Sequence, residues 1–226
     1  MFAIGKREFF QLFKGVKAIL IIILFLVTAY YSAKFAGPLA SIAELSTKEA
    51  SVAGVMFLIM FFGQLFVTSL SHDSINREVH ERTMRFLVTK TSRSSILYGK
   101  FFGIWIFWFV SLFTSFLIIS IITKKINILI FTQTMSLLTL QIAFVLCLSV
   151  LIPKPSVTMF FGMIGSIIFP ILGGWLVLTT NPAISWLKYI NPYYYFDKKD
   201  YTFVVVLLFA GILIYLANLV FKRREC

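Results

Sequence analysis

Long uncharged apolar runs alternate along the chain with short segments that carry all of its charged side chains. A helix needs about 20 apolar residues to cross the hydrocarbon core of a bilayer, and five of the six runs reach that length. The first run is shorter, but Lys17 and Lys34 beside it can extend their ammonium groups to the lipid headgroups. We therefore expect six transmembrane helices, within residues 18–33, 50–72, 101–123, 126–153, 155–187 and 201–221.

The composition agrees with this pattern. The chain is 59% hydrophobic, contains 26 Phe among its 226 residues and has a mean hydropathy of +0.92. A soluble domain has too little polar surface to cover that much apolar material. We expect an all-α integral membrane protein, with one transmembrane domain over residues 1–226 and no soluble domain.

The net charge of +12 raises the alternative of a nucleic-acid partner, but its distribution favours membrane orientation. If the N-terminus is cytoplasmic and the spans alternate, the inside segments hold fourteen Lys and Arg residues. The outside segments hold seven basic residues, all of them Lys. Cytoplasmic segments of membrane proteins carry such an excess of positive charge. We therefore expect both termini in the cytoplasm, lipid around the spans and no nucleic-acid partner.

Residues 1–15 have the pattern of an interfacial helix. Phe9 and Phe13, with either Phe2 or Leu12, fall near one helical face, and the charges lie largely on another. A helix lying in the cytoplasmic interface fits this pattern. An ordinary juxtamembrane leader fits these residues equally well.

The fifth apolar run is too long for one simple span. Pro170 removes a helical hydrogen bond, and Gly173 and Gly174 loosen the turn that follows, which predicts a kink. Residues 181–197 are then rich in Trp and Tyr, which favour the membrane–water interface. We expect one or two short helices there, lying at the outer surface or dipping into it.

The spans offer little material for catalysis. Ionisable side chains inside a bilayer are costly and are kept for a function, and the six apolar runs contain no Asp, Glu, Lys or Arg. His72 and His80 lie about two helical turns apart, too far to share one metal ion on a straight helix. Gly99-Lys100 lacks the glycine that a P-loop has five residues earlier. We expect no metal, no cofactor and no enzymatic activity in this chain.

Uncharged polar side chains do occur within the spans. Gln64 and Thr68 lie one helical turn apart in the second run, and Gln133 and Ser136 share a face in the fourth. Such residues commonly form hydrogen bonds between membrane helices. The same four residues are candidates for a translocation path or a subunit interface, and both interpretations stay open.

Residues 71–100, SHDSINREVHERTMRFLVTKTSRSSILYGK, gather charge in an ordered way. Asp73 is a good helix N-cap, and the following residues form an apolar stripe at helical spacing, consisting of Ile75, Val79, Thr83 and Phe86. Two acid–base pairs in the favourable i,i+4 order accompany it, Glu78 with Arg82 and Glu81 with Arg85. This predicts an amphipathic cytoplasmic helix, a polar turn, and a third span capped by Ser94 or Ser95. A loop needed only for orientation would require neither the stripe nor the pairs.

The segment INREVHERTMRFLVTKTSRSSILYGKF resembles the loop after the second span in permeases of type-2 ABC exporters, the type V exporter fold. The places that match the family pattern are Glu78, Thr83, Leu87, Arg93, Gly99 and Lys100. Arg82 stands where glycine is common and Lys90 where proline is common, which weakens assignment to a particular subfamily. The specific likeness covers about thirty residues, while the six-span architecture covers the chain.

The resemblance implies that residues 73–95 form a coupling helix segment. Its partner would be a separate ABC ATPase subunit, present in two copies, and a second permease chain, identical or related, would complete the path. The residues implied in ATPase coupling are Glu78, Glu81, Thr83, Arg93, Gly99 and Lys100.

Two other classes of protein remain. A membrane scaffold or immunity-type protein would share the topology but need no ATPase, and a membrane enzyme is disfavoured because the spans lack ionisable groups. The apolar spans favour a hydrophobic or amphipathic substrate, such as a peptide, drug or lipid. The composition and the family point to a bacterial plasma membrane.

Overall fold

The computed structural model describes residues 1–81, 83–179, 185–197 and 201–223. Six helices within these ranges are long and apolar enough to cross a membrane, as expected for a helical membrane protein. The second consists of α4 (Thr47–Phe57), a π-helical turn η1 (Leu58–Phe62) and α5 (Gly63–Ser71). The other five are α2 (Val16–Lys34), α8 (Arg93–Thr123), α9 (Ile128–Leu151), α10 (Pro155–Leu178) and α13 (Phe203–Arg223).

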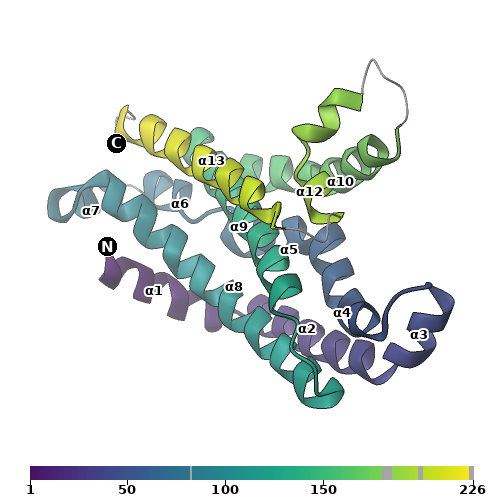
Figure 1. The fold of residues 1–226 in the computed structure, drawn as a ribbon. Helices are drawn as coiled ribbons and strands as arrows, with labels where there is room; N and C mark the ends of the chain where they lie inside the picture. The colour runs from purple at the N-terminus through teal and green to yellow at the C-terminus, as the bar shows by residue number, and fades with distance from the viewer. Residues whose placement is uncertain (82, 180–184, 198–200, 224–226) are drawn as a thin grey trace.

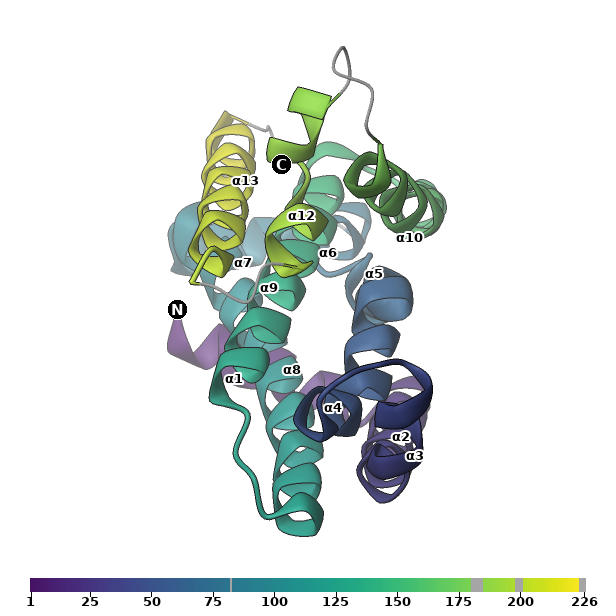
Figure 2. The same ribbon diagram turned by 45° about the vertical axis from the view of Figure 1, so that its right-hand side comes forward.

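Helix α9 occupies the centre of the bundle and packs against α13, α5, α8 and α10 (Figures 1 and 2). It is the most buried of the six helices. Its sequence explains this position, because it carries polar side chains that are costly against lipid, and among these Gln133, Ser136, Gln141 and Ser149 are all buried.

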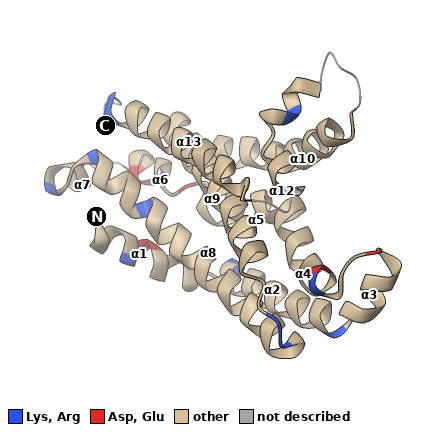
Figure 3. Ribbon diagram, in the orientation of Figure 1, with Lys and Arg blue, Asp and Glu red and all other residues tan. Residues whose placement is uncertain are grey.

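The outer helices expose large apolar side chains instead. Ile171 and Leu172 on α10 and Leu208 and Ile212 on α13 are exposed, a surface that suits lipid rather than water. Charged residues gather near the two ends of the long helices, and the stretches between them are largely free of charge (Figure 3). The N-terminus and the last turn of α13 lie at the same end of the bundle as α6 (Asn76–His80) and α7 (Met84–Lys90) (Figure 1).

Helix α1 (Phe2–Phe13) lies along α8. Its inner face is formed by Gly5, Glu8 and Leu12, with Phe9 and Phe13 partly buried beside them. The expected helix is therefore present, but its packed face includes a carboxylate, and Phe2 is 83% exposed.

The segment between the second and third spans forms two short helices, α6 and α7, where one amphipathic helix was expected. Of the predicted stripe, Ile75 is fully buried but Phe86 is 74% exposed. Arg82 lies outside the described residues, and Glu81 and Arg85, which are described, form no ion pair with each other. Instead, Asp73 pairs with Arg77 at 3.2 Å.

Helix α8 also begins slightly earlier than expected. Its N-cap is Ser92, whose hydroxyl oxygen accepts a hydrogen bond from the Ser95 backbone N–H, rather than Ser94 or Ser95. The third span therefore continues without a break from its cap through Gly99 and Lys100 into the apolar run.

Short helices cover the other end of the bundle. They are α3 (Ala36–Ile42), the 3₁₀ helix η2 (Trp186–Tyr189) and α12 (Pro192–Asp197). The first part of the expected outer segment, 181–184, lies outside the described residues. Helix α12 lies between α10 and α13 (Figure 2), and its Tyr193 is only 5% exposed, so this segment is helical and inserts a side chain among the spans.

Candidate functional site

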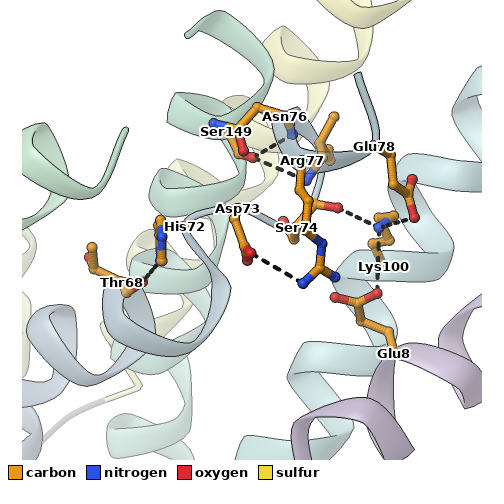
Figure 4. A network of polar contacts seen from close by, with 11 residues as sticks. Glu8, Thr68, His72, Asp73, Ser74, Asn76, Arg77, Glu78, Lys100 and Ser149 are labelled. Atoms are coloured by element: carbon orange, nitrogen blue, oxygen red, sulfur yellow. Dashed lines mark hydrogen bonds and ion pairs between the residues drawn. The ribbon is translucent and has the colours of Figure 1, made fainter. Parts of the chain in front are cut away.

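A buried lysine joins three helices where the segment between the second and third spans meets the bundle. Lys100 lies in the second turn of α8, and its Nζ is 2.9 Å from Glu78 Oε1 on α6 and 3.4 Å from Glu8 Oε2 on α1. Nζ also donates a short hydrogen bond to the Ser74 carbonyl oxygen. Figure 4 shows Glu8, Ser74 and Glu78 converging on the ammonium group.

Burying these charged groups is energetically costly. The Lys100 side chain is 2% exposed, and those of Glu8 and Glu78 are largely buried as well. A charge removed from water is tolerated only when opposite charges and hydrogen bonds replace the lost hydration. Lys100 therefore holds α1, α6 and α8 in one arrangement, and removing it leaves two carboxylates without their counter-ion.

A second set of contacts ties the start of α6 to α9 and α10. The Ser149 hydroxyl on α9 accepts hydrogen bonds from the backbone N–H groups of Ile75 and Asn76, at 3.1 and 3.2 Å. The Asn76 side chain, which is fully buried, donates to Thr158 Oγ1 at 2.7 Å and to the Ile152 carbonyl at 3.3 Å. We call residues 76–81 and 83–90, which include α6 and α7, the connector. Its first helix is thus bonded to α9 and α10.

Two further contacts border this network in Figure 4. Arg77 and Asp73 form a partly exposed ion pair within the turn that leads into α6. His72 Nδ1 lies 2.9 Å from the carbonyl oxygen of Thr68. A carbonyl can only accept, so Nδ1 carries the proton and the ring is oriented by its own helix.

Glycines allow α1 to approach α8 closely. A Cβ atom at Gly103 would lie 2.6 Å from the Gly5 carbonyl oxygen, and one at Gly99 would lie 2.8 Å from that of Met1. Such distances exclude a side chain, so these positions require glycine. The G-x-x-x-G spacing of Gly99 and Gly103 was the sequence signal for this contact, and the sequence analysis did not use it.

The residues implied in ATPase coupling fall into three groups. Glu78 and Lys100 meet inside the bundle, with Gly99 one residue from Lys100 on the α1-facing side of α8. Glu81 and Thr83 are exposed on the connector. Arg93 lies apart from both, where its Nη1 donates to the carbonyl oxygen of Lys222 at 2.8 Å, at the end of α13.

The polar residues predicted in the spans do not form one site. Gln64 donates to Thr68 Oγ1 at 3.4 Å within α5, and the Ser136 hydroxyl donates to the Gln133 carbonyl at 2.6 Å within α9. These hydrogen bonds run along a single helix rather than between helices. All four side chains are buried.

Other polar residues make hydrogen bonds between helices at mid-bundle. Gln141 on α9 donates to the Ile59 carbonyl at 3.2 Å, and the Tyr193 hydroxyl donates to the Met60 carbonyl at 3.2 Å. Both acceptors belong to the π-helical turn η1. Asn191 completes this cluster by donating to the Gly173 carbonyl at 2.9 Å.

Neither the protein-family models nor the curated proteins compared with the chain give a match. What the site does is therefore argued from its own residues.

Proposed function

We propose that the chain is the membrane-spanning permease subunit of an ATP-driven exporter of the ABC-2 type. ATP would be hydrolysed by two copies of a separate ABC ATPase subunit, so this chain is not itself an enzyme. A second permease chain, identical or related, would complete the translocation path. The observation that carries the proposal is the connector, which is bonded to the spans on one side and exposed on the other.

The exposed side of the connector has the composition of a contact surface. Phe86 is 74% exposed, and Glu81, Thr83 and Arg85, which are near it in the sequence, are exposed as well. Large aromatic side chains are enriched in protein interfaces. In the proposed complex, a groove of the ATPase covers this side.

The buried side of the connector suits the transmission of movement. Lys100 joins α6 to α1 and α8, and Asn76 joins it to α9 and α10. A displacement of α6 would therefore be transmitted to these four helices through ion pairs and hydrogen bonds. Glu78 and Lys100 accordingly transmit force inside the chain, and Glu81 and Thr83 are the residues that we assign to the ATPase contact.

The apolar spans also bear on the substrate class and the location. The large apolar surface of the spans favours a hydrophobic or amphipathic substrate, such as a peptide, drug or lipid, and the setting we propose is a bacterial plasma membrane with both termini in the cytoplasm. Gln64, Thr68, Gln133 and Ser136 stay predictions for the path or for the interface with the second permease.

One observation favours the alternative of a membrane scaffold or immunity-type protein that works without an ATPase. Glu78 finds its partner in Lys100 of the same chain, so part of the connector's charge needs no outside protein. The two functions differ in what covers Phe86 and Glu81. The test therefore addresses those two residues rather than Glu78.

The experiment is purification of the tagged protein from its native membrane in mild detergent, followed by identification of the proteins that accompany it. We expect a stoichiometric ABC ATPase with the wild type, and its loss from the double variant Glu81→Lys, Phe86→Ala. Glu44→Lys makes the same charge change in the turn after α3 and is the matched control, which should retain the ATPase.

Two results would contradict the proposal. A wild-type protein that purifies without any ATPase would favour the scaffold function. An ATPase retained equally by the double variant would mean that the connector surface is not the contact. Glu78→Lys would not answer this question, because it places a second ammonium group beside buried Lys100 and tests folding instead.

A further inference from the structure

A cavity of about 430 Å³ lies between α9, α10 and α13. Leu140 and Phe144 line it from α9, and Phe169, Leu172, Phe209 and Leu213 line it from α10 and α13. Leu187, Ile190 and Pro192 close the end on the side of η2 and α12. The cavity thus lies at the depth of the apolar runs, beneath a short helical cover.

The lining offers nothing to a charged or strongly polar ligand. It contains no Asp, Glu, Lys or Arg among the described residues. Each of its four polar side chains donates a hydrogen bond to the protein itself; they are Gln64, Gln141, Asn191 and Tyr193. Water is stable in a cavity only when it has two to four polar partners, so this cavity favours hydrocarbon.

A buried polar atom without a partner at the wall does not change this conclusion. Gln141 Oε1 has no hydrogen-bond partner among the described residues. It packs against Gly63 on α5, so closely that a Cβ atom there would lie 2.5 Å away. The oxygen is therefore covered by α5 and is withheld from the cavity.

The rim of the cavity is continuous with the apolar outer surface. Phe169 and Leu172 on α10 and Ile212 on α13 all line the cavity and are also exposed. Helix α12, which also lies between α10 and α13 (Figure 2), closes one end of the cavity. A chain that enters between α10 and α13 beside these three side chains therefore meets apolar groups.

We propose that this cavity binds one hydrocarbon chain, the acyl chain of a membrane phospholipid, which enters sideways between α10 and α13. The inference stands apart from the proposed ATPase, because it requires only the described cavity and a bilayer. A bound chain would fill space that is otherwise a void in the packing of α9, α10 and α13.

The test uses the purified full-length protein in nanodiscs made of phosphatidylcholine and phosphatidylglycerol. A trace of phosphatidylcholine with a diazirine at the end of one acyl chain is photoactivated, and the adducts are mapped by mass spectrometry. We expect adducts on Leu140, Phe144 and Leu213. A water-soluble diazirine should leave these residues unlabelled.

Two variants decide whether the label reports the cavity. Leu213→Trp fills it and should lower labelling of Leu140 and Phe144 by about tenfold or more. Leu208→Trp, on the exposed side of the same helix, is the matched control and should label like the wild type. Size-exclusion profiles of both variants check the fold.

Three results would overturn the proposal. These are lipid adducts confined to outward residues such as Ile171 and Leu208, unchanged labelling in folded Leu213→Trp, and equal labelling of the cavity by the water-soluble probe. If Leu213→Trp fails to fold, the wild-type adduct map and the water-soluble probe decide the matter alone.

Discussion

Lys100 Nζ on α8 and Glu78 Oε1 on α6 lie 2.9 Å apart, in a site where the lysine side chain is 2% exposed. Glu78 lies in the segment that links the second and third spans, and Lys100 lies in the third span. Their ion pair closes that segment onto the bundle, and Glu8 extends the closure to α1 at 3.4 Å. The stability of this end of the protein therefore depends on a charge balance rather than on apolar packing alone.

Removing Lys100 alone should lower the stability of the protein far more than removing the charges of Glu8, Glu78 and Lys100 together. Lys100→Met keeps much of the side-chain volume but leaves Glu8 and Glu78 buried without a counter-ion. We expect a loss of about 3–5 kcal/mol in the free energy of unfolding, which is typical when one partner of a buried pair is removed. Denaturant titration in detergent, followed by circular dichroism, measures this change.

The control for that prediction is the neutral triple variant Glu8→Gln, Glu78→Gln, Lys100→Met. It should recover most of the lost stability, because no charge remains buried. Lys90→Met, at an exposed position, should change stability little. A single variant Lys100→Met that unfolds like the wild type would show that the pair contributes little.

The close contact between α1 and α8 gives a second prediction. At Gly103 a Cβ atom would meet the Gly5 carbonyl oxygen at 2.6 Å, whereas at Gly211 nothing lies within 4 Å. Gly103→Ala should therefore push the two helices apart and cost about 1–3 kcal/mol, as overpacking does. Gly211→Ala should be neutral or stabilise α13 by up to about 1 kcal/mol.

Thermal unfolding of both glycine variants beside the wild type measures the difference. Cross-linking between cysteines placed at Ala3 and an exposed position of α8, Phe102, reports whether α1 has moved. Equal stability and equal cross-linking in Gly103→Ala and Gly211→Ala would contradict the close packing of the two helices.

The six spans could be predicted from the sequence because five of them are uninterrupted apolar runs long enough to cross a bilayer, and flanking lysines extend the shorter first run. The Lys100 cluster could not, because its partner Glu8 lies 92 residues away and no local periodicity encodes that contact. The i,i+4 rule pairs Glu78 with Arg82, which lies outside the described residues, and gives no indication of the contact with Lys100.

The π-helical turn at 58–62 could not be predicted from the sequence either. Its residues, LIMFF, continue the apolar run without a signal, and the turn is marked only by the side chains that bond to it, from Gln141 and Tyr193. The sequence indicated only part of the role of Gly173. Gly173 was read as a loosening of the helix, but the structure shows that it makes room for the Tyr193 ring.

This glycine pair gives a third prediction, with a built-in control. A Cβ atom at Gly173 would lie 2.7 Å from Tyr193 Cδ2, while one at Gly174 would meet nothing within 4 Å. Gly173→Ala should displace Tyr193 from Met60 and destabilise the protein by about 1–3 kcal/mol. Gly174→Ala should leave Tyr193 in place.

Hydrogen exchange of the α12 backbone amides is the sharper measurement for this pair. Faster exchange across Tyr193–Phe196 in Gly173→Ala alone is the expected result. Equal exchange in the two variants would mean that the ring is not held against the glycine.

The hydroxyl group of Tyr193 gives the last prediction, which concerns pH. Burial raises the pKa of Tyr193 to about 12, an effect that the nearby Gln141 amide reduces only in part. Below pH 10 the hydroxyl is protonated in both the folded and the unfolded chain, so its donation to the Met60 carbonyl is fully present. Between pH 10 and about 12 the unfolded chain ionises first, which removes up to about 3 kcal/mol of stability.

Tyr193→Phe separates this effect from every other group that titrates in alkali. At neutral pH the variant should lose about 1 kcal/mol, the usual worth of one hydrogen bond. Above pH 10 its stability should fall less steeply than that of the wild type, so the two curves converge and then cross, because phenylalanine has no proton to lose. Denaturant titrations at intervals from neutral pH to pH 12 test this directly. Two curves that run parallel throughout would mean that Tyr193 is accessible to water and is not held at the π-helical turn.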